Sequence, residues 1–260
     1  MKRRILFLTF IFFTQYTFAQ RNVSIKDSIS IEADSFWGVD SFDAIFYSKD
    51  NVFYKKWNNQ EWQYGDYILG QLSSVSILNP LKIMLFYESS NTIVLVDKYL
   101  TEIERINFNV ITEFKNVTKA SPANDNSIWI FDNNNQRLEL FDTNSRKTLL
   151  SAQPINELPV ALQSNFNVCW ILINNQFLQY NVYGSLLYKF QNSGYSDLCI
   201  VNNDLILKKE NNLFYYDTQS ESLEKIKLPE ITVKQFYVTN EILYIYHQTK
   251  IYSFDLTLQK

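Results

Sequence analysis

Short apolar segments alternate with polar turns along most of the chain, and one type of segment recurs. Each copy begins with an apolar residue, has Val or an aromatic residue at its fourth position and ends with Asp or Asn. The copies are residues 93–97, 138–142, 177–181, 213–217 and 251–255, and residues 52–56 occupy the equivalent place without the acid. Successive copies end 36 to 45 residues apart. A period near 40 residues made of short strands is typical of the blades of a β-propeller.

Every repeat contains enough strand-like segments for a four-stranded blade. The predicted strands before the recurring segment are 44–47, 83–87, 128–131, 168–173, 205–207 and 242–246. More polar outer strands are predicted at 102–108, 148–152, 186–190 and 222–228. Fainter inner strands are predicted at 36–39, 74–77, 117–120, 159–162, 197–201 and 235–238.

The last repeat has no fourth strand, because the chain ends five residues after Asp255. We expect the segment 23–31 to fill this place, so that the two ends of the chain close the ring. The sequence therefore predicts an all-β, six-bladed β-propeller with almost no helix. Seven blades remain open because the first repeat is irregular. A β-sandwich or an open solenoid is the alternative, but the recurring strands are apolar on both faces, which favours sheets packed on both sides.

The composition fits this architecture. The chain of 260 residues has 20 Phe, 17 Tyr and 5 Trp but only 5 Gly. This content of apolar residues excludes a disordered or collagen-like chain. Asn and Asp tolerate the left-handed backbone of tight turns, so we expect them to take the turn positions that glycine would otherwise fill.

The first nineteen residues have the layout of a secretory signal peptide. Lys2, Arg3 and Arg4 precede an apolar run over residues 5–13, and Ala19 offers a cleavage site. We predict a signal peptide at 1–19 and a single propeller domain at 20–260. The apolar run is too short to span a membrane, so no transmembrane segment is expected. No Cys follows the cleavage site closely enough for lipidation, and the expected location is the periplasm, with peripheral association with the outer membrane as a further option.

Charge argues against nucleic acid as a partner. The chain has a net charge of −3, and loss of the three cations in the leader would leave −6. A mildly acidic protein without a basic stripe is a poor candidate for binding polyanions.

Residues for catalysis or metal binding are scarce. His247 is the single histidine, and Cys169 and Cys199 are the two cysteines, whose pairing the sequence leaves open. Asp34, Asp40 and Asp43 cluster in the first repeat, and Asp197 is expected to border the central channel. The recurring acids Asp97, Asp142, Asp217 and Asp255 are interpreted as turn caps. We therefore predict no catalytic residues, no metal site and no cofactor, and expect that the protein is not an enzyme.

An aromatic segment in the first repeat is the main candidate for a binding surface. It contains Trp57, Trp62, Tyr64 and Tyr67, of which Trp62 and Tyr64 alternate onto one face of a strand. Such a platform can bind a partner protein or a sugar ring. The alternative is that these rings simply pack against a neighbouring blade.

The hairpins at 127–150, 204–226 and 241–255 resemble exported bacterial propellers of the YVTN and quinoprotein-like (PQQ-like, WD40-like) repeat group. The resemblance covers the second to sixth repeats. It implies a non-enzymatic scaffold for protein–protein interaction in envelope assembly or secretion, with envelope proteins, including an outer-membrane complex, as partners. The alternative function is an exported glycan-binding or glycan-cleaving propeller, suggested by the aromatic segment and the acids of the first repeat.

Overall fold

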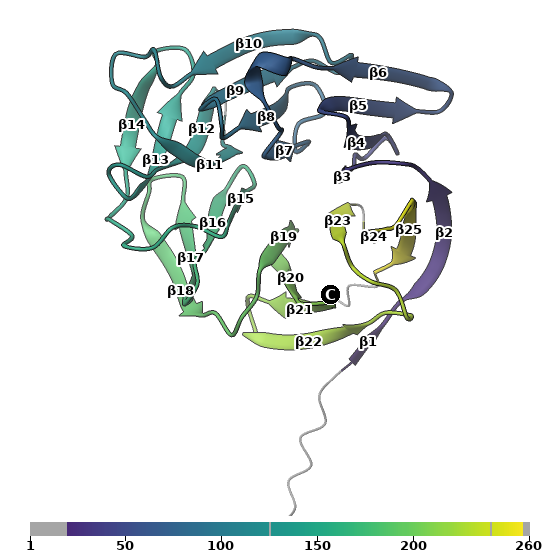
Figure 1. Cartoon of the computed structure of the whole chain (residues 1–260). Helices are drawn as coiled ribbons and strands as arrows, with labels where there is room; N and C mark the ends of the chain where they lie inside the picture. Colours follow the sequence, from purple (N-terminus) through teal and green to yellow (C-terminus); the bar gives the residue numbers. More distant parts are fainter. Residues whose placement is uncertain (1–19, 125, 240, 257–260) are drawn as a thin grey trace, which may run out of the picture.

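Six sheets, five of four strands and one with a fifth, short strand, form a closed ring in the computed structural model, which describes residues 20–124, 126–239 and 241–256 (Figure 1). The fold is a six-bladed β-propeller, as predicted, and not a seven-bladed one. The predicted signal peptide, residues 1–19, lies outside the described residues. Among the residues described, no helix has the length and apolar character needed to cross a membrane.

Each blade is an antiparallel meander that runs outward from the centre of the ring. Blade 1 contains β3 (Ser35–Val39), β4 (Ile45–Lys49), β5 (Val52–Trp57) and β6 (Gln60–Tyr64), and blade 2 contains β7 (Ser74–Ser76), β8 (Ile83–Tyr87), β9 (Thr92–Val96) and β10 (Glu102–Asn107). Blade 3 contains β11 (Val117–Pro122), β12 (Ser127–Asp132), β13 (Arg137–Asp142) and β14 (Lys147–Ser151), and blade 4 contains β15 (Ala161–Ser164), β16 (Val168–Leu172), β17 (Gln176–Asn181) and β18 (Leu186–Gln191). Blade 5 contains β19 (Asp197–Val201), β20 (Asp204–Lys209), β21 (Asn212–Asp217) and β22 (Ser222–Lys227), and blade 6 contains β23 (Gln235–Thr239), β24 (Ile242–His247), β25 (Lys250–Asp255) and β2 (Ser24–Ser30).

The N-terminal strand closes the ring, as predicted. β2 pairs antiparallel with β25 in a register that runs from Ser24 opposite Asp255 to Ser30 opposite Lys250. Figure 1 shows the purple β2 beside the yellow β25. The preceding strand β1 (Gln20–Asn22) pairs in parallel with β22, so the N-terminal segment joins the outer edges of blades 5 and 6.

The core lies between the blades. Every residue of β8 and β9 is buried, which confirms that the central strands are apolar on both faces. Trp129 and Trp170 are each fully buried in the stack of blades. Because these large aromatic side chains fill the space between adjacent sheets, the aromatic content of the chain is chiefly a packing feature.

The inner strands surround an axial channel. Two cavities of about 240 and 280 Å³ share Ser74, Gln163 and Tyr237. At Gly38, which has a φ of 141°, a Cβ atom would lie 2.8 Å from Cγ of Tyr237, so only glycine lets β3 pack this closely on β23. The inner strand of blade 4 begins at Ala161, two residues later than predicted, because Pro159 has no N–H to donate to a β-ladder.

Residues of more types than predicted occupy the turn positions that need a left-handed backbone. Thirteen described residues other than glycine have a positive φ, and six of these are Asn or Asp. The others include Gln136, Glu210 and Gln248 in hairpin turns. The prediction that Asn and Asp replace glycine is therefore correct for about half of these positions. Longer polar or charged side chains occupy the rest, except for the apolar Leu100.

Candidate docking cleft between blades 1 and 2

Trp57 and Trp62, two of the four predicted binding residues, line one cavity of about 340 Å³. Both lie on the β5–β6 hairpin of blade 1, whose turn is at the same end of the blade as the β3–β4 turn. The opposite wall comes from the β7–β8 and β9–β10 connections of blade 2. We call this cavity the 1–2 cleft, and its lining residues are Asp40, Phe42, Ala44, Lys55, Trp57, Gln60, Trp62, Pro80, Leu81, Lys98 and Tyr99.

The rim of the 1–2 cleft is apolar and exposed to solvent. The exposed fractions of Phe42, Leu81, Tyr99 and Trp57 are 64, 65, 52 and 40%. Trp57 Nε1 donates a hydrogen bond of 2.9 Å to the carbonyl oxygen of Phe42. The rings of Trp62 and Tyr99 lie 5.9 Å apart between centroids. These contacts hold the aromatic side chains in place before any partner arrives.

A buried carboxylate with incomplete hydrogen bonding also lines the cleft. Asp40 is only 4% exposed. Its Oδ1 accepts hydrogen bonds of 2.9 Å from the backbone N–H groups of Phe42 and Ala44 and so caps the β3–β4 turn. Its Oδ2 has no hydrogen-bond partner among the described residues. A buried acceptor without a donor destabilises the fold, by about 1–3 kcal/mol in typical cases.

A buried ammonium group lies in the same cleft. Lys55 is 8% exposed, and its Nζ donates a hydrogen bond of 3.0 Å to the carbonyl oxygen of Lys98. Nζ also lies 5.6 Å from the ring centroid of Phe46 and 5.7 Å from that of Trp62. Burial lowers the pKa of Lys55. The negative charge of Asp40 opposes this effect of burial on the pKa, although no direct salt bridge joins the two groups among the described residues. The hydrogen bond to Lys98 uses one of the three N–H donors of Lys55.

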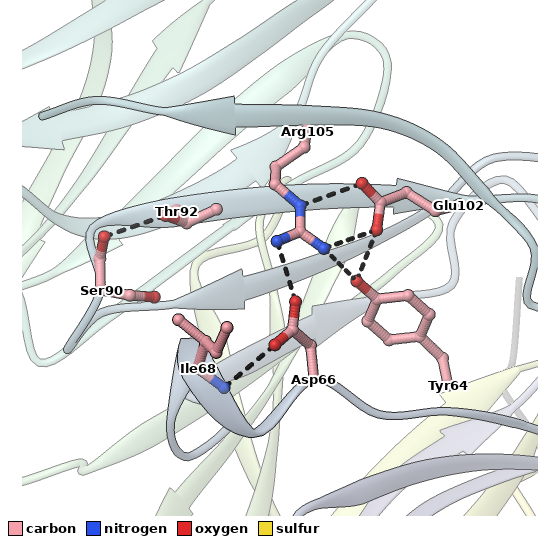
Figure 2. Close-up of polar contacts among 7 residues, drawn as sticks. All are labelled: Tyr64, Asp66, Ile68, Ser90, Thr92, Glu102 and Arg105. Atoms are coloured by element: carbon pink, nitrogen blue, oxygen red, sulfur yellow. Dashed lines mark hydrogen bonds and ion pairs between the residues drawn. The ribbon is translucent and has the colours of Figure 1, made fainter. Parts of the chain in front are cut away.

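Tyr64, the third predicted residue, belongs to a polar cluster outside the cleft (Figure 2). Its hydroxyl donates a hydrogen bond of 2.7 Å to Oε2 of Glu102 and accepts one of 3.1 Å from Nη2 of Arg105. Arg105 also binds Glu102 through two N–H groups and Asp66 at 2.8 Å. Burial and the hydrogen bond to Glu102 raise the pKa of Tyr64. This residue therefore joins the outer strands of blades 1 and 2, and it does not line the cleft.

Tyr67, the fourth predicted residue, lies on the 3-10 helix η1 (Tyr67–Leu69), the one helical element among the described residues. Asp66 caps this turn by accepting a hydrogen bond of 3.0 Å from the N–H of Ile68. Tyr67 is 82% exposed and is not part of the cleft lining. The four predicted residues are thus divided between a cleft, a structural cluster and an exposed turn.

The acids of the first repeat do not form a hydrolytic pair. Asp34 precedes β3 and accepts a hydrogen bond from the N–H of Asp50, whereas Asp40 follows β3. The extended strand between them separates their backbones by roughly 20 Å at about 3.3 Å per residue. Glycosidases require about 5–9.5 Å between their carboxyl groups. Asp43 is exposed in the turn after Asp40 and does not line the cleft.

The other candidate residues lie elsewhere. Asp197 borders the channel, as predicted, and burial raises its pKa. His247 ends β24. Cys169 and Cys199 are free, buried thiols, and burial raises the pKa of Cys199 to about 12. In the part of the chain that is described, no group of three His, Cys, Asp or Glu side chains gathers closely enough to hold a metal ion.

Sequence reasoning missed most of the cleft. Phe42, Leu81 and Tyr99 lie in turns that are far apart along the chain, and only the stacking of blade 2 on blade 1 brings them together. The one available signal was the position of these apolar residues in turns, where polar residues are usual.

Comparison with solved structures supports the propeller fold but does not identify a function. The chain matches no protein-family profile and no curated sequence. Virginiamycin B lyase from Staphylococcus aureus superimposes with a TM-score of 0.60 and 11% identity, covering 92% of this chain and 95% of the lyase. BamB from Moraxella catarrhalis gives a TM-score of 0.50 and 10% identity, covering 84% of this chain and 68% of BamB. PorZ, a surface component of the type-IX secretion system of Porphyromonas gingivalis, gives a TM-score of 0.53 and 14% identity, covering 91% of this chain and 31% of PorZ. These identities show a shared propeller fold, on which unrelated functions occur.

Proposed function

We propose that this chain is a non-enzymatic scaffold for protein–protein interaction in the bacterial cell envelope. In this proposal it is exported to the periplasm and binds envelope proteins there, including an outer-membrane complex. The observation that carries it is the exposed apolar rim of the 1–2 cleft. The similarity to PorZ, a surface component of a secretion system, is consistent with such a role.

The rim has the properties of an interface centre. Large aromatic side chains that are exposed together around a hollow are characteristic of docking sites, and Trp and Tyr are enriched among the residues that contribute most to binding. Trp57 and Tyr99 supply such anchors, and Phe42 and Leu81 extend the apolar area around them. Because the rings are already fixed by contacts within the protein, little side-chain entropy is lost on association.

Export is proposed from the amino-terminal sequence. Residues 1–19 have the cationic start, apolar run and small residue of a signal peptide. Fractionation of cells that express the full chain should recover it in the periplasm with Gln20 as its first residue. Recovery of the uncleaved chain in the cytoplasm would contradict this part of the proposal.

Site-specific photo-crosslinking in cells tests the docking role. A photoreactive amino acid at position 81 or at position 42 should yield the same discrete adduct with an envelope protein. The control position is 110, where Val110 is 79% exposed in the β10–β11 connection, away from the cleft lining. The proposal would be overturned if the protein with the photoreactive residue at 42 or 81 stayed an uncrosslinked monomer, or if all three positions crosslinked equally.

Glycan binding is the second candidate function. The observation that favours it is the placement of Trp57 and Trp62 in one cavity with the polar side chains of Asp40, Lys55 and Gln60. A sugar ring can stack on an indole while its hydroxyl groups bind such residues. A glycan array should then show binding that Trp57→Ala abolishes and that Val110→Ser leaves intact.

A further inference from the structure

Asp40 and Lys55 are costly residues for a cavity that serves packing alone. Asp40 has a buried oxygen with no donor, and Lys55 has a buried ammonium group with a single hydrogen bond among the described residues. Each arrangement destabilises the fold. Asp40 and Lys55 both line the 1–2 cleft and attract each other, but no direct salt bridge joins them among the described residues. Buried polar groups that remain unsatisfied at a cavity require a role, and binding a ligand supplies one.

The two groups define the chemistry of an occupant. Asp40 Oδ2 needs a hydrogen-bond donor, and Lys55 Nζ offers donors to an acceptor. A simple cation would satisfy Asp40 but would be repelled by Lys55 and Lys98, both of which line the cleft. A simple anion would satisfy the lysines but would be repelled by Asp40. The cleft is therefore complementary to a neutral group that donates and accepts at neighbouring positions.

Two neutral partners meet this requirement, a sugar and a peptide main chain. The rim distinguishes them. Phe42 and Leu81 project with about two-thirds of their surface exposed. The hydroxyl-lined edge of a sugar cannot cover such side chains without losing hydration, whereas apolar side chains of a peptide cover them favourably. In an extended peptide, the N–H and C=O of one residue point to the same side, as they do in a β-ladder.

We propose that the 1–2 cleft binds an extended segment of a partner protein through its main chain. One residue of the segment donates its N–H to Asp40 Oδ2 and accepts from Lys55 Nζ at its C=O. An apolar side chain of the segment lies on the rim against Phe42 and Leu81. This inference rests on the docking role proposed above and specifies what docks.

Two substitutions test the main-chain contacts and retain the local fold. Asp40→Asn keeps Oδ1 as the acceptor for the N–H groups of Phe42 and Ala44 but replaces the free acceptor with an amide donor. Lys55→Met keeps the aliphatic stem and removes the donors. Asp40→Asn keeps the size and shape of the side chain and its cap on the turn, and Lys55→Met removes a buried charge, so we expect both variants to fold, with cooperative thermal unfolding as the check. Val110→Ser serves as the control for surface changes outside the cleft.

Random twelve-residue peptides displayed on phage are selected on the immobilised protein, and the selected peptides are synthesised with a fluorescent label. Their affinity, measured by fluorescence anisotropy, should fall at least tenfold in Asp40→Asn and in Lys55→Met, and should be unchanged in Val110→Ser. Methylating the peptide backbone nitrogens one at a time should identify a single position that weakens binding at least tenfold. That same methylation should have no further effect on binding to Asp40→Asn, because the N–H and the carboxylate are one contact.

The outcomes separate this inference from the docking proposal. If selected peptides depend on Leu81, as tested with Leu81→Ser, but not on Asp40 or Lys55, the docking face stands and the main-chain contacts are refuted. If no peptide binds the cleft while position 81 still crosslinks in cells, docking by an extended segment is refuted. If oligosaccharides bind and Trp57→Ala abolishes their binding, the ligand of the cleft is a glycan and the peptide proposal is refuted. Loss of both peptide binding and crosslinking removes both proposals.

Discussion

At the scale of single residues, the most buried ion pair among the described residues joins the β10–β11 connection to β13 of blade 3. Lys115 Nζ lies 2.8 Å from Oε2 of Glu139, and the two side chains are 8 and 4% exposed. The hydroxyl of Thr148 donates a 2.7 Å hydrogen bond to the same carboxylate oxygen. Lys115→Met would leave Glu139 buried without its counter-charge, so the free energy of unfolding should fall by about 3 kcal/mol.

Urea unfolding of the two single variants and of the double variant measures this effect. Lys115→Met combined with Glu139→Leu should recover most of the lost stability, because no unpaired charge then remains buried. If the double variant instead loses the sum of the two single effects, the pair does not act as a unit and the interpretation is wrong.

Residues with a local role were predictable, and residues with a role between blades were not. Asp97 was interpreted as a turn cap, and its Oδ1 accepts hydrogen bonds of 2.8 Å from the N–H groups of Tyr99 and Thr101. Asp142 and Asp217 cap their turns in the same way. Asp255 differs, because it forms an ion pair with Lys26 of β2. The buried Lys–Glu pair was not predictable because its members lie far apart in the sequence and meet only when the connection between blades 2 and 3 packs on β13.

At the scale of elements, the Arg105 cluster fastens the loop after β6 to β10 (Figure 2). The hydrogen bond from Arg105 lowers the pKa of Glu102 below its usual value of 4.5. The stabilisation from Glu102 is therefore complete above about pH 4.5 and is lost as the pH falls through the lower pKa of the folded state. The side chains are about one-third exposed, so screening limits the contribution to about 1 kcal/mol even within a network.

Thermal unfolding as a function of pH tests this element contact. Glu102→Gln should lower the melting temperature at pH 7 and match the unsubstituted protein once the pH lies below the lowered pKa of Glu102, where this carboxyl group is protonated. Glu32→Gln, which alters an isolated and exposed pair with Lys49, should change the melting temperature at neither pH. If the melting temperature of Glu102→Gln stays below that of the unsubstituted protein at low pH, the loss of stability comes from packing and not from the charge of Glu102.

The elements themselves were largely predictable, and their irregularities were not. The period of about 40 residues located the strands because a four-stranded blade repeats the same alternation of apolar strand and polar turn. The outer strands of blades 2, 3 and 4 each contain a β-bulge, at Ile103, Leu149 and Leu187. The sequence around these exposed residues gives no sign of a bulge. In the structure the bulges interrupt the outer edge of the blade and so protect it from pairing with other chains. The 1–2 cleft escaped prediction for a related reason, since its rim depends on how two blades are placed relative to each other.

At the scale of the whole molecule, the ring closes through one strand, and the closure depends on how that strand is anchored. All residues of β2 are exposed, so the strand itself contributes little apolar burial. The next residue, Ile31, is 7% exposed, packs with Phe36 and Tyr246, and donates a 2.8 Å hydrogen bond to the carbonyl oxygen of Thr249. Ile31 is therefore a buried anchor for the N-terminal strand at the end of β2.

Substitution of this anchor should affect the entire ring. Ile31→Ala should lower the free energy of unfolding by about 2–4 kcal/mol, whereas Ile29→Ala, at a position 40% exposed on the same strand, should cost well under about 1 kcal/mol. Because each blade is packed between two others in a closed ring, loss of the anchor should shift one cooperative transition and should not detach blade 6 alone. Urea unfolding followed both by tryptophan fluorescence, which reports on blades 1, 3 and 4, and by far-ultraviolet circular dichroism distinguishes these cases. Two transitions that separate in Ile31→Ala would show that the N-terminal strand stabilises its own blade and not the ring.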